Sequence, residues 1–572
     1  MRLTMRRGTI ILFGIVNGLI IFMNYRAYNL DSLRVMSSDF IQDKVDYFKN
    51  LMGRQDGDED YISYTYKRPR TKSLNWGSIE GIHKALPAYE KMRRVLSSLH
   101  DYKTVFNHNI GYVGITREML RFKSVPNVGD SDHLSALFVD VLQTNRSLKI
   151  GVIGGTLSQN NVCLTKSCIY IDLVAKWLTE ILDTSVTVHN AAISSTSSEY
   201  FAWCLQPHLD VLNMDIIIWE LATEDYVNRE LYLRYGLTSA GWPQEEVTRR
   251  ILDLPNKPYL MYFNFLSAEN IRKRDCVNSE YFSGRHLGKH YNVTSISWCN
   301  AVCTRLWKYG FTPDDLIYTD DLLSETSHQQ GALFIINYFR LILEQVTLDV
   351  MNKTKSDESY IKNLIRLHDR FVQNTYGLSL EPVANQPIKP SNFQNTSIGP
   401  LFSHIVLKDT KCWPVSKPQY VKGQALQAIQ TNGWELGYSH NENWYMSTGT
   451  NQRIIFKISI APHQDNLNAT VAIALVTCNY CGQALMWLND MFGDAKLINS
   501  NAKHHIFAVR VIFTGVPPGD YTVSLKAMEE KPFKIGAVMT SYDDKQSNET
   551  VSDETKVEFG GPRTWGKLKQ LN

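Results

Sequence analysis

The sequence predicts an α/β domain with a parallel sheet flanked by helices, followed by a β-sandwich and preceded by a single transmembrane helix. Three patterns support this fold class: an uncharged apolar run at residues 8–23, apolar runs that alternate with amphipathic stretches within residues 77–347, and short alternating runs between turn residues in residues 411–542. A parallel sheet covered on both faces has continuously apolar strands, whereas the strands of a sandwich alternate.

Composition excludes several classes of protein. Of the 572 residues, 44% are hydrophobic and 20% are charged, so the chain can bury a sizeable core and wholesale disorder is excluded. Lys and Arg number 60 and Asp and Glu 57, which gives a net charge of +3. This balance leaves little excess positive charge to attract the phosphate groups of a nucleic acid. We therefore expect no nucleic-acid partner.

The transmembrane helix is predicted at the extreme N-terminus. The run Gly8–Met23 has no charged residue, and it is preceded by Arg2, Arg6 and Arg7. Positive charge on this side places the N-terminus in the cytoplasm and the rest of the chain in the lumen. No small-x-small cleavage site follows, which favours an uncleaved signal anchor over a cleaved signal peptide. We expect a single-pass type II protein of the ER or Golgi membrane with a luminal C-terminus.

Changes in pattern divide the chain into six predicted regions. They are a cytoplasmic tip with the anchor helix at 1–25, a stem at 26–76, the α/β domain at 77–347, a helix and a linker rich in Pro and Asn at 348–410, the sandwich at 411–542, and a disordered tail at 543–572. The α/β domain should contain strands at 148–153, 185–189, 215–221 and 258–266 and helices at 79–99, 131–143, 170–182 and 331–346. In the sandwich we expect strands at 453–460, 469–476, 505–513 and 521–527.

Nine cysteines and six Asn-x-Ser/Thr sites are compatible with a luminal location. Cys163–Cys168 and Cys299–Cys303 are plausible disulfides because the partners are near in sequence, and the odd count leaves one thiol over. Cys478 and Cys481 have the spacing of half a zinc site, but no second ligand pair completes it, so a structural role is favoured. We expect no metal and no cofactor. The sites for glycosylation are Asn145, Asn292, Asn352, Asn395, Asn468 and Asn548.

Polar residues follow the first three predicted strands. Gly154-Gly155-Thr156-Leu157-Ser158 follows the first strand, Asn190–Ser194 the second and Ala222–Asp225 the third. A last polar segment, Thr319–Gly331, leads into the final helix. The carboxyl ends of parallel strands lie at one edge of a sheet, where ligands bind, so we expect these segments to form the functional site.

The order of these segments resembles that of the SGNH (GDSL-type) hydrolases over about residues 145–347. That family has Gly-x-Ser, Asn-Gly-Ala and an Asn-Asp pair after successive strands, and Asp-x-x-His before the last helix. The stretch Asn190–Leu205 and the tripeptide Trp219-Glu220-Leu221 are similar to a branch of membrane-anchored, capsule-associated proteins of fungi. Those proteins also carry a C-terminal β-sandwich, and Gly433–Leu436 and Gly519–Tyr521 look similar to it. The resemblance implies an esterase or an O-acyl (acetyl) transferase acting on a glycan or polysaccharide.

The resemblance also assigns roles to single residues. Thr156 stands at the position of the nucleophilic Ser, with Ser158 as a substitute, and His328 at the position of its base. The Thr156 N–H would be one donor of the oxyanion hole. The other positions are those of the residue that orients the His, Glu325 or Asp321, and of the remaining oxyanion-hole donors, Ala191 and Glu224.

All four blocks depart from the family pattern. The methyl group of Thr156 crowds its hydroxyl, Ala191 replaces a Gly, and the ionised carboxylate of Glu224 would repel a developing oxyanion. Glu325-x-x-His328 replaces Asp-x-x-His. The alternative is therefore a catalytically inactive pseudoenzyme that binds a glycan or a protein partner. A plain adhesion or scaffold protein is a third reading, and it would require a different central fold.

Structural roles compete with the catalytic ones. Thr156 can be a turn residue, His328 can lie in the first turn of a helix capped by Thr326 or Ser327, and Glu224 with Asp225 can form a solvated loop pair.

Two further features favour structure over chemistry. No apolar strand precedes Gly129-Asp130-Ser131, which is typical of a helix N-cap despite its likeness to the family motif. In a sandwich, aromatic residues are more often core than sugar platforms, and this applies to Trp413, Trp434, Trp444 and Tyr445.

Overall fold

The computed structural model describes residues 91–101, 113–116, 119–120, 124–159, 168–228, 241–273, 286–306, 310–318, 322–352, 401–402, 407–415, 425–439 and 442–542. All of them belong to one compact unit, Tyr66–Asn572. The predicted anchor helix, the stem and the tail lie outside the described residues and stay predictions. Within the described part of the chain, no helix is both long enough and apolar enough to cross a membrane.

Five parallel strands form the sheet of the α/β domain, in the order β2-β1-β3-β4-β5. Their bounds are Leu148–Gly154 (β1), Val186–Asn190 (β2), Ile216–Glu220 (β3), Tyr259–Asn264 (β4) and Thr294–Ser297 (β5). Every side chain of β3 and β4 is buried, and all but the last residue of each strand, Glu220 and Asn264, are apolar or aromatic as the sequence predicts. The edge strand β2 is only partly buried. The predicted parallel sheet is confirmed.

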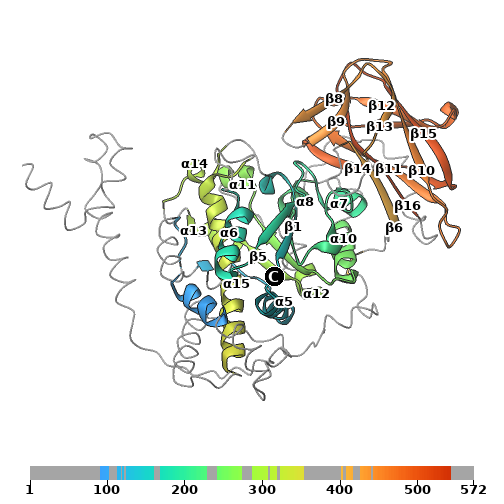
Figure 1. The fold of residues 1–572 in the computed structure, drawn as a ribbon. Helices are drawn as coiled ribbons and strands as arrows, with labels where there is room; N and C mark the ends of the chain where they lie inside the picture. The colour runs from blue at the N-terminus through green and yellow to red at the C-terminus, as the bar shows by residue number, and fades with distance from the viewer. Residues whose placement is uncertain are drawn as a thin grey trace, which may run out of the picture. The chain divides into compact units, whose positions relative to one another are not determined.

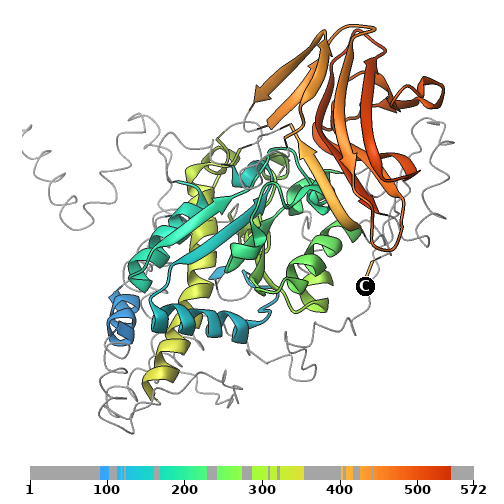
Figure 2. The same cartoon turned by 45° about the vertical axis from the view of Figure 1, so that its right-hand side comes forward.

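Helices flank this sheet, as Figure 1 and Figure 2 show. They are α5 (Ser131–Thr144), α6 (Tyr170–Leu182), α7 (Ser198–Cys204), α8 (Ala222–Val227), α10 (Trp242–Asp253), α11 (Ala268–Lys273), α12 (Gly288–His290), α13 (Trp298–Leu306), α14 (Pro313–Leu316) and α15 (Glu325–Asn352), with 3-10 turns η2 (Thr156–Ser158) and η3 (Val211–Asn213). Ile216 and Ile218 of β3 belong to the hydrophobic cluster of α5, α6 and α15. Ile217 and Trp219 belong to the cluster of α7 and α10, so the sheet has a core on each face.

The start of α5 explains the sequence Gly129-Asp130-Ser131. Asp130 is the N-cap, and its carboxylate accepts the His133 N–H at 3.1 Å. Gly129 has a φ of +66°, in the left-handed region, and a Cβ there would lie 2.1 Å from the Thr294 nitrogen. The predicted N-cap is therefore confirmed.

Two antiparallel sheets form the C-terminal sandwich. One has the order β13-β12-β15-β10-β7, and the other has the order β14-β11-β16-β9-β8 with β6 also paired to β16. The bounds are Lys408–Pro414 (β6), Ala428–Asn432 (β7), Trp434–Ser439 (β8), Glu442–Ser447 (β9), Arg453–Ile460 (β10), Ala469–Thr477 (β11), Gln483–Leu488 (β12), Lys496–Asn499 (β13), Ile506–Val516 (β14), Gly519–Ala527 (β15) and Phe533–Tyr542 (β16), with a 3-10 turn η7 (Phe492–Asp494) between β12 and β13. The predicted antiparallel C-terminal part is confirmed.

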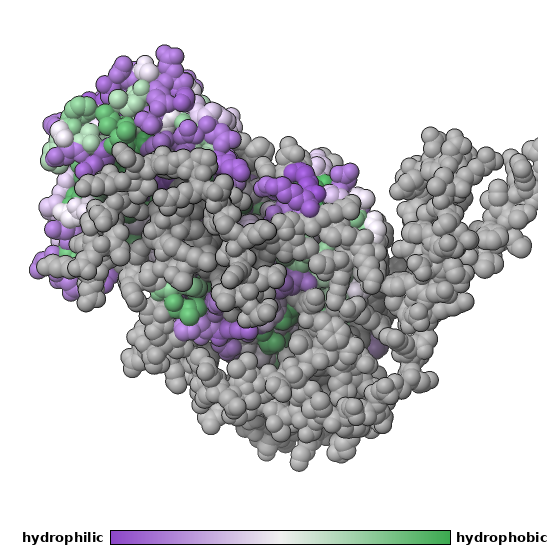
Figure 3. All heavy atoms as spheres, turned by 180° about the vertical axis from the view of Figure 1, so that it is seen from behind, coloured by the Kyte–Doolittle hydropathy of each residue, from purple (hydrophilic) through white to green (hydrophobic). Residues whose placement is uncertain are grey.

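Tryptophans of the sandwich lie in its interior. Trp413, Trp434 and Trp444 are buried, so they do not offer open faces to a sugar ring. The most exposed large aromatic residue among those described is Tyr438, at 82%. On the face drawn in Figure 3, hydrophobic residues are interspersed among hydrophilic ones over the described surface.

The sandwich and the α/β domain share a hydrophobic core. Phe507 and Val509 of β14 belong to the same buried cluster as Tyr200 and Phe201 of α7. A disulfide between Cys204 and Cys412 joins α7 to β6. Every residue of β11 is buried, which its sequence ATVAIALVT explains because it is apolar on both faces. The two domains therefore pack against each other within one compact unit.

The disulfides differ in part from those expected. Cys299 is buried and forms no disulfide, whereas Cys303 is disulfide-bonded, so the predicted Cys299–Cys303 pair is wrong. Cys168 is bonded as well, and its predicted partner Cys163 lies outside the described residues. Cys478 and Cys481 are joined to each other, which is a structural role. Among the described residues, no cluster of His, Cys, Asp and Glu could hold a metal ion.

Candidate active site

The order of the strands reverses at β1, which lies between β2 and β3. The connection from β1 leads outward to β2, and the chain then returns to β3 on the other side of β1. Ligands of open α/β sheets bind outside this point, where the strand order reverses. Thr156 follows β1, Ser194 and Ser195 follow β2, and Glu224 follows β3. These segments are therefore the candidate site.

Thr156 lies in a cluster of hydroxyl groups. It is half-buried in η2, and its Oγ1 lies 3.1 Å from the Oγ of Ser194. The same Oγ1 accepts the Ser195 N–H at 3.1 Å. The backbone N–H of Thr156 donates to Glu224 Oε1 at 2.7 Å. The hydroxyl reaches the edge of the sheet as predicted from the sequence, but its backbone donor is already in use.

Glu224 is buried against the backbone of the first strand's loop. Its Oε2 accepts the Thr223 hydroxyl at 2.6 Å, and a Cβ on Gly155 would come within 2.1 Å of its carboxyl group. Burial raises the pKa of Glu224, while the hydrogen bonds from Thr223 and Thr156 act in the opposite direction. Because a Cβ at position 155 would overlap the Glu224 carboxyl group, the packing of Glu224 on this loop requires a glycine there. Glu224 is buried in α8, so the expected solvated loop pair is wrong. Its carboxyl group accepts the Thr156 N–H, which is a donor that an oxyanion would use.

The neighbouring acid, Asp225, is also buried. It accepts the N–H of Ser198 at 2.7 Å and the hydroxyl of the same residue. Burial raises the pKa of Asp225 to about 7, against the effect of these hydrogen bonds. The acid therefore fixes the start of α7, next to the candidate site.

The other predicted oxyanion position is occupied by a backbone hydrogen bond. The Ala191 N–H donates to Val152 O at 2.9 Å, which extends the pairing of β2 with β1. The Gly155 N–H likewise donates to Glu220 O at 3.2 Å. In the described structure these donors are directed into the protein, so an oxyanion would need other partners.

Ser158 points into the interior and not toward the edge of the sheet. It is fully buried, its hydroxyl donates to Glu220 Oε2 at 2.9 Å, and it lies 2.9 Å from the Tyr170 hydroxyl. Burial raises the pKa of Glu220 well above its ordinary value, and the nearby charge of Glu224 adds to the effect. Ser158 therefore links strand ends to α6 and does not reach solvent.

His328 lies in the aromatic core. Its ring stacks on Tyr170 with centroids 6.3 Å apart and meets Phe265 edge-on at 5.8 Å. Neither ring nitrogen has a hydrogen-bond partner among the described residues, and burial lowers the pKa of His328 to about 4. The structure thus does not join His328 to Thr156 by a hydrogen bond.

The two residues expected to orient His328 do not do so in the described structure. Glu325 is exposed and accepts from Gln329 Nε2 at 3.1 Å, and Asp321 lies outside the described residues. Helix α15 begins at Glu325, and Ser324 Oγ accepts the Ser327 N–H at 3.3 Å. The expected cap by Thr326 or Ser327 is wrong, because both lie inside the helix.

A second histidine, which the sequence did not single out, contacts the site. His505 Nδ1 lies 3.3 Å from Ser195 Oγ. His505 precedes β14 of the sandwich and is far from the α/β motifs in sequence, so no spacing could reveal it. The Ser-rich run Ser194–Ser198 was visible, but without a partner it gave no signal of a role.

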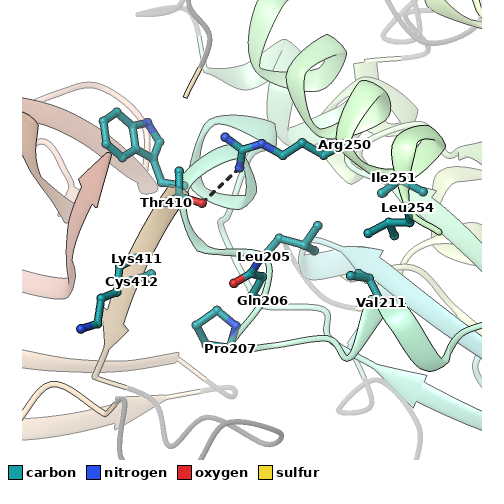
Figure 4. Close-up of a pocket in the computed structure, with 11 residues that line it drawn as sticks. Leu205, Gln206, Pro207, Val211, Arg250, Ile251, Leu254, Thr410, Lys411 and Cys412 are labelled. Carbon is teal, nitrogen blue, oxygen red and sulfur yellow. Dashed lines mark hydrogen bonds between the residues drawn. The ribbon is translucent and has the colours of Figure 1, made fainter. Parts of the chain in front are cut away.

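A small cavity lies between α10, the segment after α7, and β6 (Figure 4). In this view Arg250 points to β6, and its Nη1 donates to Thr410 Oγ1 at 3.2 Å. Its Nη2 donates to Leu407 O at 2.6 Å, and its Nε pairs with Glu246 at 2.8 Å. The volume of about 70 Å³ is far below the ~300–1,000 Å³ of usual ligand pockets. The arginine therefore joins the two domains.

Comparisons with known proteins show structural likeness alone. No family model and no curated protein matches the chain. A two-domain esterase active on acetylated mannans, co-crystallised with mannopentaose, matches with a TM-score of 0.47 and 13% identity over 74% of this chain and 97% of that chain. A family two carbohydrate esterase from Cellvibrio japonicus matches with a TM-score of 0.17 and 8% identity over 24% and 34%. A C-terminal carbohydrate-binding module (CBM6) of a laminarinase from Zobellia galactanivorans matches with a TM-score of 0.18 and 9% identity over 23% and 99%.

Proposed function

We propose that this protein acts on acylated glycans as an O-acyl esterase or an O-acyltransferase, at the carboxyl ends of β1, β2 and β3. The observation that carries the proposal is the hydroxyl cluster at the strand-order reversal. Thr156 Oγ1 lies within 3.1 Å of both Ser194 Oγ and the Ser195 nitrogen, and Thr156 and Ser195 are half-exposed. Acyl transfer needs a positioned hydroxyl and nearby donors for the developing oxyanion. The glycan as substrate rests on the family resemblance of the sequence.

A second candidate function is binding of a glycan without chemistry. Two observations favour it: Glu224 occupies the Thr156 N–H at 2.7 Å, and both ring nitrogens of His328 lack hydrogen-bond partners among the described residues. An arrangement inherited from the hydrolase family would then serve recognition alone.

Acetate release from an acetylated mannan by the full chain separates the two candidates. We expect slow release by the wild type and faster release by Glu224→Asn, because the shorter neutral side chain frees the Thr156 N–H for the oxyanion. One such donor is worth roughly 10²–10³ in rate. Glu180→Asn, on the exposed side of α6, is the matched control and should leave the rate unchanged. Mannan binding with no acetate release by wild type or by Glu224→Asn would favour the non-catalytic candidate.

A further inference from the structure

Ser195 has an unusual backbone conformation for its residue type. Its φ is +58°, in the left-handed region that favours glycine. It stands between strand β2 and helix α7, so a tight turn presents its side chain at the edge of the sheet. Non-glycine residues in this region are concentrated at functional sites, and a strained Ser between a strand and a helix is the geometry of a nucleophile elbow. The side chain is half-exposed and so accessible to a ligand.

The backbone that carries His505 is held by hydrogen bonds on both sides of this residue. The Phe507 N–H donates to Ser195 O at 2.8 Å, and Thr196 and Phe507 form an isolated parallel bridge. On the other side, the Thr477 hydroxyl donates to His504 O at 2.7 Å. The backbone on either side of His505 is therefore fixed. Its ring is exposed, with Nδ1 at 3.3 Å from Ser195 Oγ.

We propose that Ser195 is the nucleophile of this site and that His505, supplied by the β-sandwich, is its general base. This inference rests on the proposed acyl chemistry and names the residues that perform it. A Ser–His separation of 3.3 Å is within the looser range of unliganded active sites. The substrate class is the O-acyl ester of a glycan named in the proposed function, and the half-exposed Ser195 and the exposed His505 leave the pair accessible to it.

The reaction balances with water as the co-reactant. His505, protonated on Nε2, takes the Ser195 proton on Nδ1 while Oγ attacks the ester carbonyl carbon. The tetrahedral intermediate collapses, the bond to the sugar oxygen breaks, and that oxygen takes the proton from His505. Water then loses a proton to His505 and attacks the acyl group, which leaves as a carboxylic acid while Ser195 regains its proton. A second sugar hydroxyl in place of water gives acyl transfer.

Thr156 takes a different role under this assignment. Its Oγ1 already accepts the Ser195 N–H at 3.1 Å, and it shares a second hydrogen bond with Ser194 at 3.1 Å. When Ser194 is the donor of that bond, the Thr156 O–H is left to donate to a third atom. An oxyanion formed at Ser195 supplies this acceptor. Thr156 is then a donor to the oxyanion and not the attacking group.

Covalent labelling of the full-length wild type tests the assignment without any substitution. A fluorophosphonate probe reacts with activated serine or threonine hydroxyls, and peptide mass spectrometry identifies the labelled residue. We expect the label on Ser195. A label on Thr156 contradicts the proposal, and so does labelling of several serine and threonine residues without a preference for Ser195.

Variants test the base and the oxyanion donor. His505→Gln should lower the kcat for 4-nitrophenyl acetate by roughly 10²–10⁴, whereas the adjacent control His504→Gln should not change it. Thr156→Val should lower kcat by roughly 10²–10³ and still permit labelling of Ser195, and Thr156→Ser should restore the rate. If His505→Gln retains wild-type turnover, this assignment fails and the proposed function stands. If the wild type shows neither turnover nor label, both fail.

Discussion

Burial has opposite consequences for two titratable side chains near the site. His328 is buried in its neutral form, so burial lowers its pKa to about 4. Asp225 is buried as well, and burial raises its pKa to about 7. The folded protein therefore binds a proton more weakly than the unfolded chain at His328 and more strongly at Asp225. The two residues change stability with pH in opposite directions.

His328 should destabilise the protein in acid. Its pKa in the unfolded chain is ordinary, 6.5, and about 4 in the fold, so stability is lost as pH falls through this window. From these values the loss is about 2 kcal/mol at pH 5. His328→Leu should remove it, with a thermal midpoint that falls less than that of the wild type between pH 7 and pH 5. An equal fall in both proteins would show that the imidazole is not buried and neutral.

Residue identity alone could not show which of the candidate site residues lie together. The Glu325-x-x-His328 spacing is compatible with an oriented base, yet the fold puts Glu325 at the surface and His328 among Tyr170 and Phe265. The direction of each side chain depends on where the helix begins. We predicted a start at residue 331, whereas α15 begins at Glu325, and residues three apart in a helix do not point in the same direction. The side-chain direction of Glu224, back onto the loop of β1, has no sequence signal either.

At the scale of elements, apolar runs predicted strands well, whereas a short polar strand was missed. The run at 453–460 forms β10 with the predicted bounds, and the run at 148–153 forms β1, which extends one residue further to Gly154. The strand β5 was missed because its sequence is TSIS. Its polar side chains are buried with hydrogen bonds, such as that from Asn264 Nδ2 to Ser295 Oγ at 3.3 Å. Hydrophobic periodicity cannot detect a strand whose burial depends on such bonds.

The end of β3 and α8 forms a buried acidic element with its own pH dependence. Asp225 keeps its proton to about pH 7 in the fold but loses it near 3.8 when unfolded, so its contribution to stability falls as pH rises through this window. Between pH 5 and pH 8 we expect Asp225→Asn to remove about 3 kcal/mol of this fall. Thermal midpoints at the two pH values measure it. Asp140→Asn, on an exposed part of α5, serves as the control. A slope that the Asp225 variant does not change would contradict the burial argument.

At the scale of the molecule, the α/β domain and the sandwich belong to one compact unit and share a hydrophobic core. The linker composition at 382–400 lies outside the described residues and says nothing about how the domains pack. The union depends on the Cys204–Cys412 disulfide and on cross-domain contacts, such as that from the Val509 N–H to Glu199 Oε2 at 3.3 Å. Such pairs are more than two hundred residues apart in sequence and leave no local pattern. The packing of the two domains also brings His505 of the sandwich to the candidate site.

The disulfides bear on where the protein matures. Cys204–Cys412 and Cys478–Cys481 are bonded, and Cys168 and Cys303 are each in a further disulfide. Disulfides persist in oxidising compartments and are rare in the cytosol. We propose, as the sequence predicts, a luminal domain behind an N-terminal anchor, and bonded cysteines are compatible with that location.

A luminal location makes a prediction about glycosylation. The side chains of Asn145 and Asn468 are exposed and lie in Asn-x-Ser/Thr sites, so both should carry N-linked glycans when the full chain is made in a secretory cell. Ser147→Ala should remove one glycan without altering Asn145, whose φ of +55° closes α5, and Ser147→Thr is the control that keeps the site. Asn468→Gln should remove the other.

Glycosidase treatment followed by electrophoresis measures each loss, and carbonate extraction should leave the protein in the membrane pellet. A chain that glycosidase does not shift, or that carbonate releases, would overturn the type II topology, because a luminal domain meets the glycosylation machinery and an uncleaved anchor resists extraction.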